Sequence, residues 1–219
     1  MSARAAGSRR IGPVVGAVGF VLAWLAGLLV RGPGPALDAP GAEVAAYYDH
    51  HRGSTLAQAV LVHGVAAACL VLVVLGVEYA TSRERARPSD VAFLLAGCLA
   101  AAISGLQLGF DITLSTTVGP ADAATARLLF DTVNRLQAVK FCALAALALA
   151  GFELGRRRVL PRWLEWTALP LAAALLVAAA GYLTLDPALG DAAALALALL
   201  LLWVAGAGFA VSAEDHRSG

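Results

Sequence analysis

The chain has 219 residues, of which 60% are hydrophobic and 14% are charged, and its mean hydropathy is +0.77. Soluble domains carry about 25% charged residues, so this composition excludes an ordinary soluble fold. The formal net charge of +1 argues against nucleic acid as a partner.

Taken in chain order, six apolar segments are each long enough to cross a hydrocarbon core of about 30 Å, because a helix rises roughly 1.5 Å per residue. They predict membrane-spanning helices near 11–31, 56–80, 91–113, 132–155, 164–184 and 191–212. Little sequence remains between these segments. We therefore expect one integral membrane domain over 1–219, an all-α polytopic bundle whose first partner is the lipid bilayer.

The arginines at and beyond the ends of these spans gather on one side of the membrane. Eleven lie in the two tails and in the second and fourth connections, whereas three lie on the other side. The positive-inside rule then predicts a multi-pass plasma-membrane protein with both termini in the cytoplasm. The eleven are Arg4, Arg9, Arg10, Arg83, Arg85, Arg87, Arg156, Arg157, Arg158, Arg162 and Arg217, and the three are Arg31, Arg52 and Arg127.

The longest connection, 32–55, starts with Pro and Gly but continues as "PGAEVAAYYDHHR", whose body favours a helix ending before Gly53. We expect a short helix near 41–52 on the outer membrane surface, with Tyr47 and Tyr48 in the interfacial aromatic belt. The adjacent Asp49, His50 and His51 point about 100° apart on such a helix and cannot converge on a metal by themselves. We therefore predict no metal site.

Two spans contain rows of small residues that let helix backbones approach closely. Gly12 and Gly16 form such a row in the first span, and Ala101, Gly105 and Gly109 form one in the third. These rows predict close packing, either within the bundle or against a second copy or another membrane subunit.

The stretch "FDTVNRLQAVKF", residues 130–141, contains the only asparagine and the only lysine of the chain. One interpretation is an anchor at the outer interface. Asp131 and Arg135, four residues apart, would then form an ion pair, and Lys140 would extend its ammonium to the headgroups.

The other interpretation is a pocket open to the outside. His63 lies in the second span, and Gln107 and Asp111 lie one turn apart in the third. An ionisable group in hydrocarbon costs at least ~2.5 kcal/mol, so such groups tend to face the bundle interior or a wet cavity. The candidate lining residues are His63, Gln107, Asp111, Asn134, Gln137 and Lys140.

Within this set we expect an ion pair between Asp111 and Lys140, across the antiparallel third and fourth spans. His63 could relay protons, because small environmental changes move an imidazole between its charged and neutral forms. It could equally be a neutral, hydrogen-bonded group of the bundle. No second histidine lies within a span to complete a bis-histidine haem site, and we predict no cofactor.

Several motifs of membrane enzymes and motors are absent from the sequence. It contains no GxxxxGK, HExxH, GxSxG or DDxxD pattern, and we nominate no catalytic residue. The "YYDHHR" helix, the "D..N.L..K" entry to the fourth span, the "LPRW" turn and a Leu-rich last span with Trp resemble small six-span membrane proteins of high-GC Gram-positive bacteria. The resemblance implies a plasma-membrane location and this six-helix layout, and no activity.

Three functions remain open. The first is a non-enzymatic binding or accessory protein that takes a small ligand from the outer face. The second is a small secondary transporter or proton-coupled permease that uses His63, Asp111 and Lys140, for which a broken helix near the midplane is expected. The third is a membrane enzyme acting on a lipid or quinone at the outer leaflet.

Overall fold

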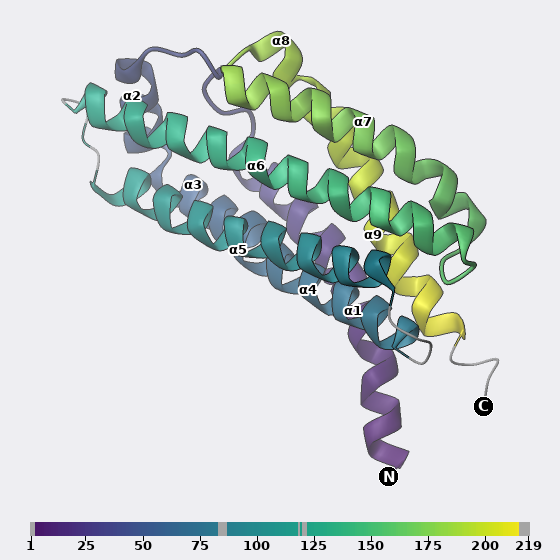
Figure 1. Ribbon diagram of the computed structural model, residues 1–219. Coiled ribbons are helices and arrows are strands. Elements are labelled where there is room, and N and C mark those ends of the chain that lie inside the picture. The colour runs from purple at the N-terminus through teal and green to yellow at the C-terminus, as the bar shows by residue number, and fades with distance from the viewer. Residues whose placement is uncertain (1–2, 83–86, 118, 120–121, 215–219) are drawn as a thin grey trace.

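The computed structural model describes residues 3–82, 87–117, 119 and 122–214, and the regular elements in these ranges are helices (Figure 1). Six helical segments of this described part are long and apolar enough to cross a membrane, which confirms the prediction of an all-α, multi-span bundle. The elements are α1 (Ala3–Arg31), α2 (Gly41–His50), α3 (Arg52–Ala59), the π-helical segment η1 (Val60–Val65), α4 (Ala66–Thr81), α5 (Pro88–Thr117), α6 (Ala123–Arg156), α7 (Arg162–Thr184), α8 (Pro187–Gly190) and α9 (Ala192–Glu214).

Consecutive spans pack side by side, and α9 returns to pack against α1 and α4. The second span is a composite of α3, η1 and α4. Figure 1 shows that α1 begins and α9 ends at the same end of the bundle, while α2 lies at the opposite end. We call the first of these the arginine end, because the arginine-rich turn between α6 and α7 lies there, and the second the α2 end.

Two helices are longer than the predicted spans. We expected the fourth span to begin near 132, but α6 begins at Ala123, and α5 continues to Thr117. With 34 residues α6 is about 51 Å long, well beyond a hydrocarbon core of about 30 Å. Hydropathy marks where a helix leaves the membrane, whereas backbone hydrogen bonding lets it continue into water.

The extensions of α5 and α6 form a platform for α2. Val44, Ala45 and Tyr48 of α2 are buried against Leu114, Ala126 and Phe130 of the two long helices. We call Leu114, Ala126 and Phe130 the α2 platform. Gly41 lies so close to α6 that a Cβ there would overlap the carbonyl oxygen of Ala123. The predicted short helix is present, and it packs on protein along its apolar face.

The two rows of small residues behave differently. A Cβ on Gly16 would lie 2.7 Å from the carbonyl oxygen of Cys69, so this part of the first row serves the contact between α1 and α4. Among the described residues, no atom lies within 4 Å of a Cβ at Gly105 or Gly109, so these two glycines make no close helix contact within the bundle. Large apolar side chains such as Leu29 and Leu202 are exposed, as expected of a surface that faces lipid.

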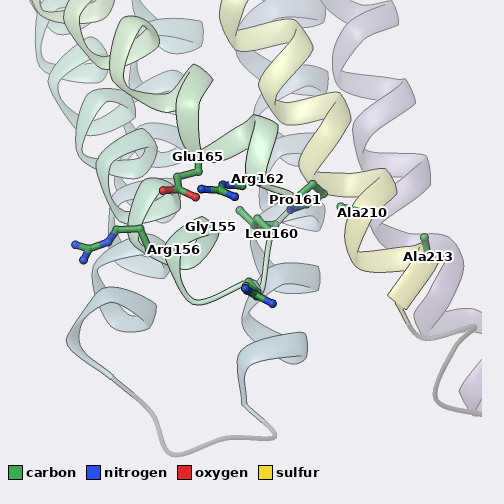
Figure 2. Close-up of a pocket in the computed structure, with 9 residues that line it drawn as sticks. Gly155, Arg156, Leu160, Pro161, Arg162, Glu165, Ala210 and Ala213 are labelled. Atoms are coloured by element: carbon green, nitrogen blue, oxygen red, sulfur yellow. The ribbon is translucent and has the colours of Figure 1, made fainter.

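The arginine end is organised by the turn between α6 and α7 (Figure 2). The amide of Val159 donates to Leu154 O at 3.0 Å, and that of Arg158 donates to Gly155 O at 2.9 Å, which is a Schellman motif. Arg158 occupies the left-handed position of this motif with φ 63°, where glycine is usual. The neighbouring Arg157 forms a buried ion pair with Asp90 at the start of α5.

Candidate functional site

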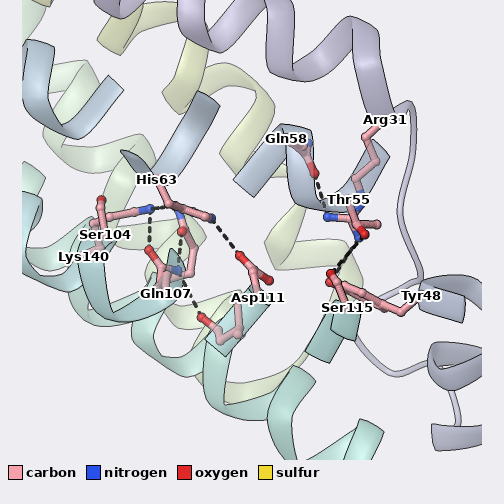
Figure 3. Close-up of polar contacts among 12 residues, drawn as sticks. Arg31, Tyr48, Thr55, Gln58, His63, Ser104, Gln107, Asp111, Ser115 and Lys140 are labelled. Atoms are coloured by element: carbon pink, nitrogen blue, oxygen red, sulfur yellow. Dashed lines mark hydrogen bonds and ion pairs between the residues drawn. The ribbon is translucent and has the colours of Figure 1, made fainter. Parts of the chain in front are cut away.

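Five of the six predicted pocket residues form one polar network with the backbone carbonyl of Val133, in the half of the bundle nearer the α2 end. They are His63, Gln107, Asp111, Gln137 and Lys140 (Figure 3). Lys140 lies 16 residues before the end of α6 at Arg156, or about 24 Å along the helix. Its ammonium donates to Gln107 Oε1 at 2.6 Å. Gln107 Nε2 donates in turn to Gln137 Oε1 at 2.9 Å and to Val133 O at 3.2 Å.

Lys140 is not an interfacial anchor. Its side chain is only 4% exposed, and its ammonium is held inside the bundle by Gln107. Gln107 is completely buried, so its amide takes the place that water would have around the ammonium. The interpretation that Lys140 extends to the headgroups is therefore wrong.

His63 stands between Lys140 and Asp111. Its Nδ1 lies 3.4 Å from Lys140 Nζ, and its Nε2 lies 3.3 Å from Asp111 Oδ2. The expected pairing of Asp111 with Lys140 is thus replaced by an indirect one, with the imidazole as the middle member (Figure 3). Three helical segments contribute: η1 carries His63, α5 carries Asp111, and α6 carries Lys140.

The π-helical segment explains how His63 reaches this position. A π turn inserts one extra residue into the helix, so the side chains before it are rotated relative to those after it. His63 lies inside the six-residue segment Val60–Val65, and π turns occur frequently at functional sites. The apolar pattern of the second span does not reveal such a turn, which is why sequence reasoning missed it.

The other polar residues of the 130–141 stretch lie outside the network. Asn134 is buried on α6, and its Nδ2 has no hydrogen-bond partner in the described part of the chain. Asp131 pairs with Arg127, whose Nε lies 2.8 Å from Asp131 Oδ1, and not with Arg135 as predicted. Both arginines are four residues from Asp131, so spacing alone could not choose between them.

A second polar layer separates the network from the α2 end, and sequence reasoning did not predict it. Arg31, at the end of α1, donates from Nη1 to Gln58 Oε1 at 2.7 Å and from Nη2 to Tyr48 Oη at 3.2 Å. Beside it, the hydroxyls of Thr55 and Ser115 share a hydrogen bond of 3.0 Å (Figure 3). We call Arg31, Tyr48, Gln58, Thr55 and Ser115 the cover layer.

The guanidinium of Arg31 also lies over the rings of Tyr47 and Tyr48, 5.2 Å and 5.1 Å from their centroids. Tyr48 is 3% exposed, and this burial raises the pKa of its phenol to about 12. Tyr48 therefore stays a neutral hydrogen-bonding group at every physiological pH. The sequence predicts both tyrosines in an interfacial aromatic belt, and in the structure both accept hydrogen bonds from Arg31.

The cavity that touches the network is small. It has a volume of about 20 Å³, is bordered by Lys140 and Ser104, and is otherwise lined by apolar side chains. A space of this size admits about one water molecule. In the described ranges, no group of three or more His, Cys, Asp or Glu side chains is arranged to hold a metal ion.

No known protein family matches the chain, and no curated protein and no solved structure shows significant similarity to it. The chemistry of the network is therefore the main guide to function.

Proposed function

We propose that this chain is a proton-coupled permease of the plasma membrane, with both termini in the cytoplasm and the α2 end facing outward. The observation that carries the proposal is the position of His63, with one ring nitrogen toward Asp111 and the other toward Lys140. A group that is set between an acid and a base by its two nitrogens can receive a proton on one side and release one on the other.

The network contains groups that can take up or release a proton. In the arrangement that fits the contacts, Nε2–H of His63 faces the carboxylate of Asp111 while Nδ1 faces the ammonium of Lys140. Adding a proton at Asp111 or removing one from Lys140 changes the charge of the network by one unit. Because unpaired charge in a low-dielectric interior is costly, each change favours a rearrangement of the helices that carry these groups.

The second support is the π-helical segment within the second span. Transport requires that one part of a bundle move against another, and discontinuous helices commonly carry the coupling site. The helix of the second span is continuous, and the π turn at Val60–Val65 changes its geometry locally around His63. The cover layer then closes the outward route in the present conformation, because Arg31 donates hydrogen bonds to both Gln58 and Tyr48.

The two other functions expected from the sequence have weaker support. A binding protein that takes a small ligand from outside needs a pocket of at least a few hundred Å³, whereas the cavity beside Lys140 holds about 20 Å³. An enzyme acting on lipid or quinone would need its acid or base beside a cleft open to lipid, and Asp111 and Lys140 are 6% and 4% exposed.

The test is a proton-jump measurement on proteoliposomes adsorbed to a solid-supported electrode, which needs no knowledge of the transported substrate. A drop in external pH should displace charge in the wild-type protein, because protons enter the network from one side. His63→Gln and Lys140→Met should reduce the displaced charge to the level of empty liposomes.

Asp131→Asn is the matched control, since it removes a carboxylate of α6 that lies outside the network and should leave the signal unchanged. A wild-type protein without displaced charge, or a His63→Gln variant with the full signal, would contradict the proposal.

A further inference from the structure

A concavity lies at the arginine end, away from the polar network around Lys140. It has a volume of about 750 Å³ and is bounded by the α6–α7 turn, the first turn of α7 and the last turns of α9, where Ala210 and Ala213 form one wall (Figure 2). Arg156, Arg158 and Arg162 line it together with one carboxylate, that of Glu165. Over the described residues, the lining therefore carries an excess of two positive charges.

Within the described part of the chain, ion pairs do little to neutralise these arginines. Arg156 has only a loose contact with Glu153, 3.4 Å apart and largely exposed, which contributes little to stability. Within the described part of the chain, Arg158 and Arg162 have no carboxylate partner. The guanidiniums of Arg158 and Arg162 therefore face the same cavity without a carboxylate partner among the described residues, and a guanidinium fork matches the oxygens of a phosphate group.

The backbone holds one of these arginines at a cost. Arg158 takes the left-handed position of the Schellman motif, with φ 63°, where glycine would be unstrained. Strained positions of this kind gather at functional sites, where the surrounding structure holds them. Here the bonds Val159 N to Leu154 O and Arg158 N to Gly155 O supply that support.

The start of α7 also favours an anion in this cavity. Pro161 precedes the helix and gives it no side-chain cap. The positive end of the helix dipole lies at Pro161 and Arg162, which both line the cavity. Trp163 and Trp166 lie on the same turns and are 51% and 60% exposed. Exposed tryptophans are typical of the headgroup level of a membrane, which places the cavity within reach of lipid phosphates.

We propose that this cavity binds a phosphate group, with Arg158 and Arg162 as its principal ligands, and that the group belongs to an anionic phospholipid of the leaflet at the arginine end. Basic pockets between helix ends on the cytoplasmic side are suited to such headgroups. The same chemistry would also accept a soluble phosphate, and the experiment separates the two sources.

The experiment measures the thermal stability of the full chain in detergent, with and without added phosphatidylglycerol, phosphatidylcholine or inorganic phosphate. The wild-type protein should be stabilised by phosphatidylglycerol in a saturable manner, and not by phosphatidylcholine. Stabilisation by phosphatidylglycerol alone assigns the site to lipid, and equal stabilisation by inorganic phosphate assigns it to a soluble phosphate.

The variants decide whether the arginines are responsible. Arg158→Gln with Arg162→Gln should weaken the apparent affinity for phosphatidylglycerol roughly tenfold or more. Arg158→Gly is the sharper variant, because it keeps the left-handed turn and removes only the guanidinium. It should be at least as stable as the wild type without lipid, and its response to lipid should be smaller.

Arg135→Gln is the matched control, since Arg135 is an exposed arginine near the α2 end. It should respond to phosphatidylglycerol like the wild type. An unaltered lipid response in both the double variant and Arg158→Gly, or the absence of stabilisation by either phosphate source, would overturn the proposal.

Discussion

At the scale of single residues, the burial of Lys140 is the central fact. An ammonium inside a membrane bundle is tolerated only where acceptors surround it, and Gln107 and His63 supply them. Its nearest acidic residue in the network, Asp111, is reached through the imidazole. The charges of Asp111 and Lys140 therefore balance each other through the imidazole of His63, without a direct contact.

This indirect contact predicts energetic coupling between Asp111 and Lys140. Lys140→Met should lower the free energy of unfolding by about 3 kcal/mol, because it leaves a buried carboxylate without its compensating charge. The double variant with Asp111→Asn should be roughly 1 kcal/mol more stable than the sum of the single changes predicts. Thermal or denaturant unfolding of the four proteins in detergent measures the cycle.

The control cycle pairs Lys140→Met with Asp131→Asn. Asp131 belongs to a separate ion pair with Arg127, nine residues before Lys140 on α6, or about 13 Å along the helix. These two changes should add. Additivity in both cycles would show that His63 does not link Asp111 to Lys140.

At the scale of elements, α2 is held by the platform that α5 and α6 build beyond the predicted spans. The contact depends on Gly41, which leaves room for the backbone of Ala123, and on burial of Val44, Ala45 and Tyr48. Because Tyr48 also holds Arg31, the docking of α2 and the closure of the cover layer are mechanically connected.

Gly41→Val should therefore displace α2 from α6 and destabilise the protein by about 1–3 kcal/mol, the usual cost of overpacking a contact. The loss is measured as a lower Tm in detergent. Gly53→Ala is the control, because nothing lies within 4 Å of a Cβ at Gly53, and it should leave the Tm unchanged or slightly higher. Equal Tm values for Gly41→Val and the wild type would mean that α2 is not packed on α6 in solution.

At the scale of the whole molecule, α6 is the most buried of the six spans and packs between α5 and α7. It carries Lys140 in its middle and ends at the arginine-lined cavity, so both candidate sites of the protein share one helix. Because successive spans run in opposite directions, the first turn of α1 and the last turn of α9 lie at the same end of the bundle (Figure 1).

The proposed orientation makes a direct prediction for intact cells. Arg52→Cys, an exposed position at the α2 end, should react with a membrane-impermeant maleimide added outside. Ala213→Cys, an exposed position at the arginine end, should react only after the membrane is permeabilised. The parent protein, with Cys69, Cys98 and Cys142 within the spans, gives the background, and the reverse pattern would invert the topology.

Most of the fold and part of the site could be predicted from the sequence. Apolar length alone located six helices, since it depends only on the residues of each segment. The residues of the network were also identifiable, because ionisable and amide groups stand out in such segments: His63, Gln107, Asp111, Gln137 and Lys140 were all named. The helix near 41–52 followed from its composition.

The sequence by itself thus determined that the chain has six long apolar helices and which polar groups these helices carry. Only the tertiary structure decided how these groups pair: His63 between Asp111 and Lys140, Arg127 with Asp131, and Arg31 with Tyr48 and Gln58. Hydropathy is a property of each segment, whereas a partner depends on how neighbouring helices are rotated and shifted. One π turn in the second span changes that rotation without leaving a trace in the apolar pattern.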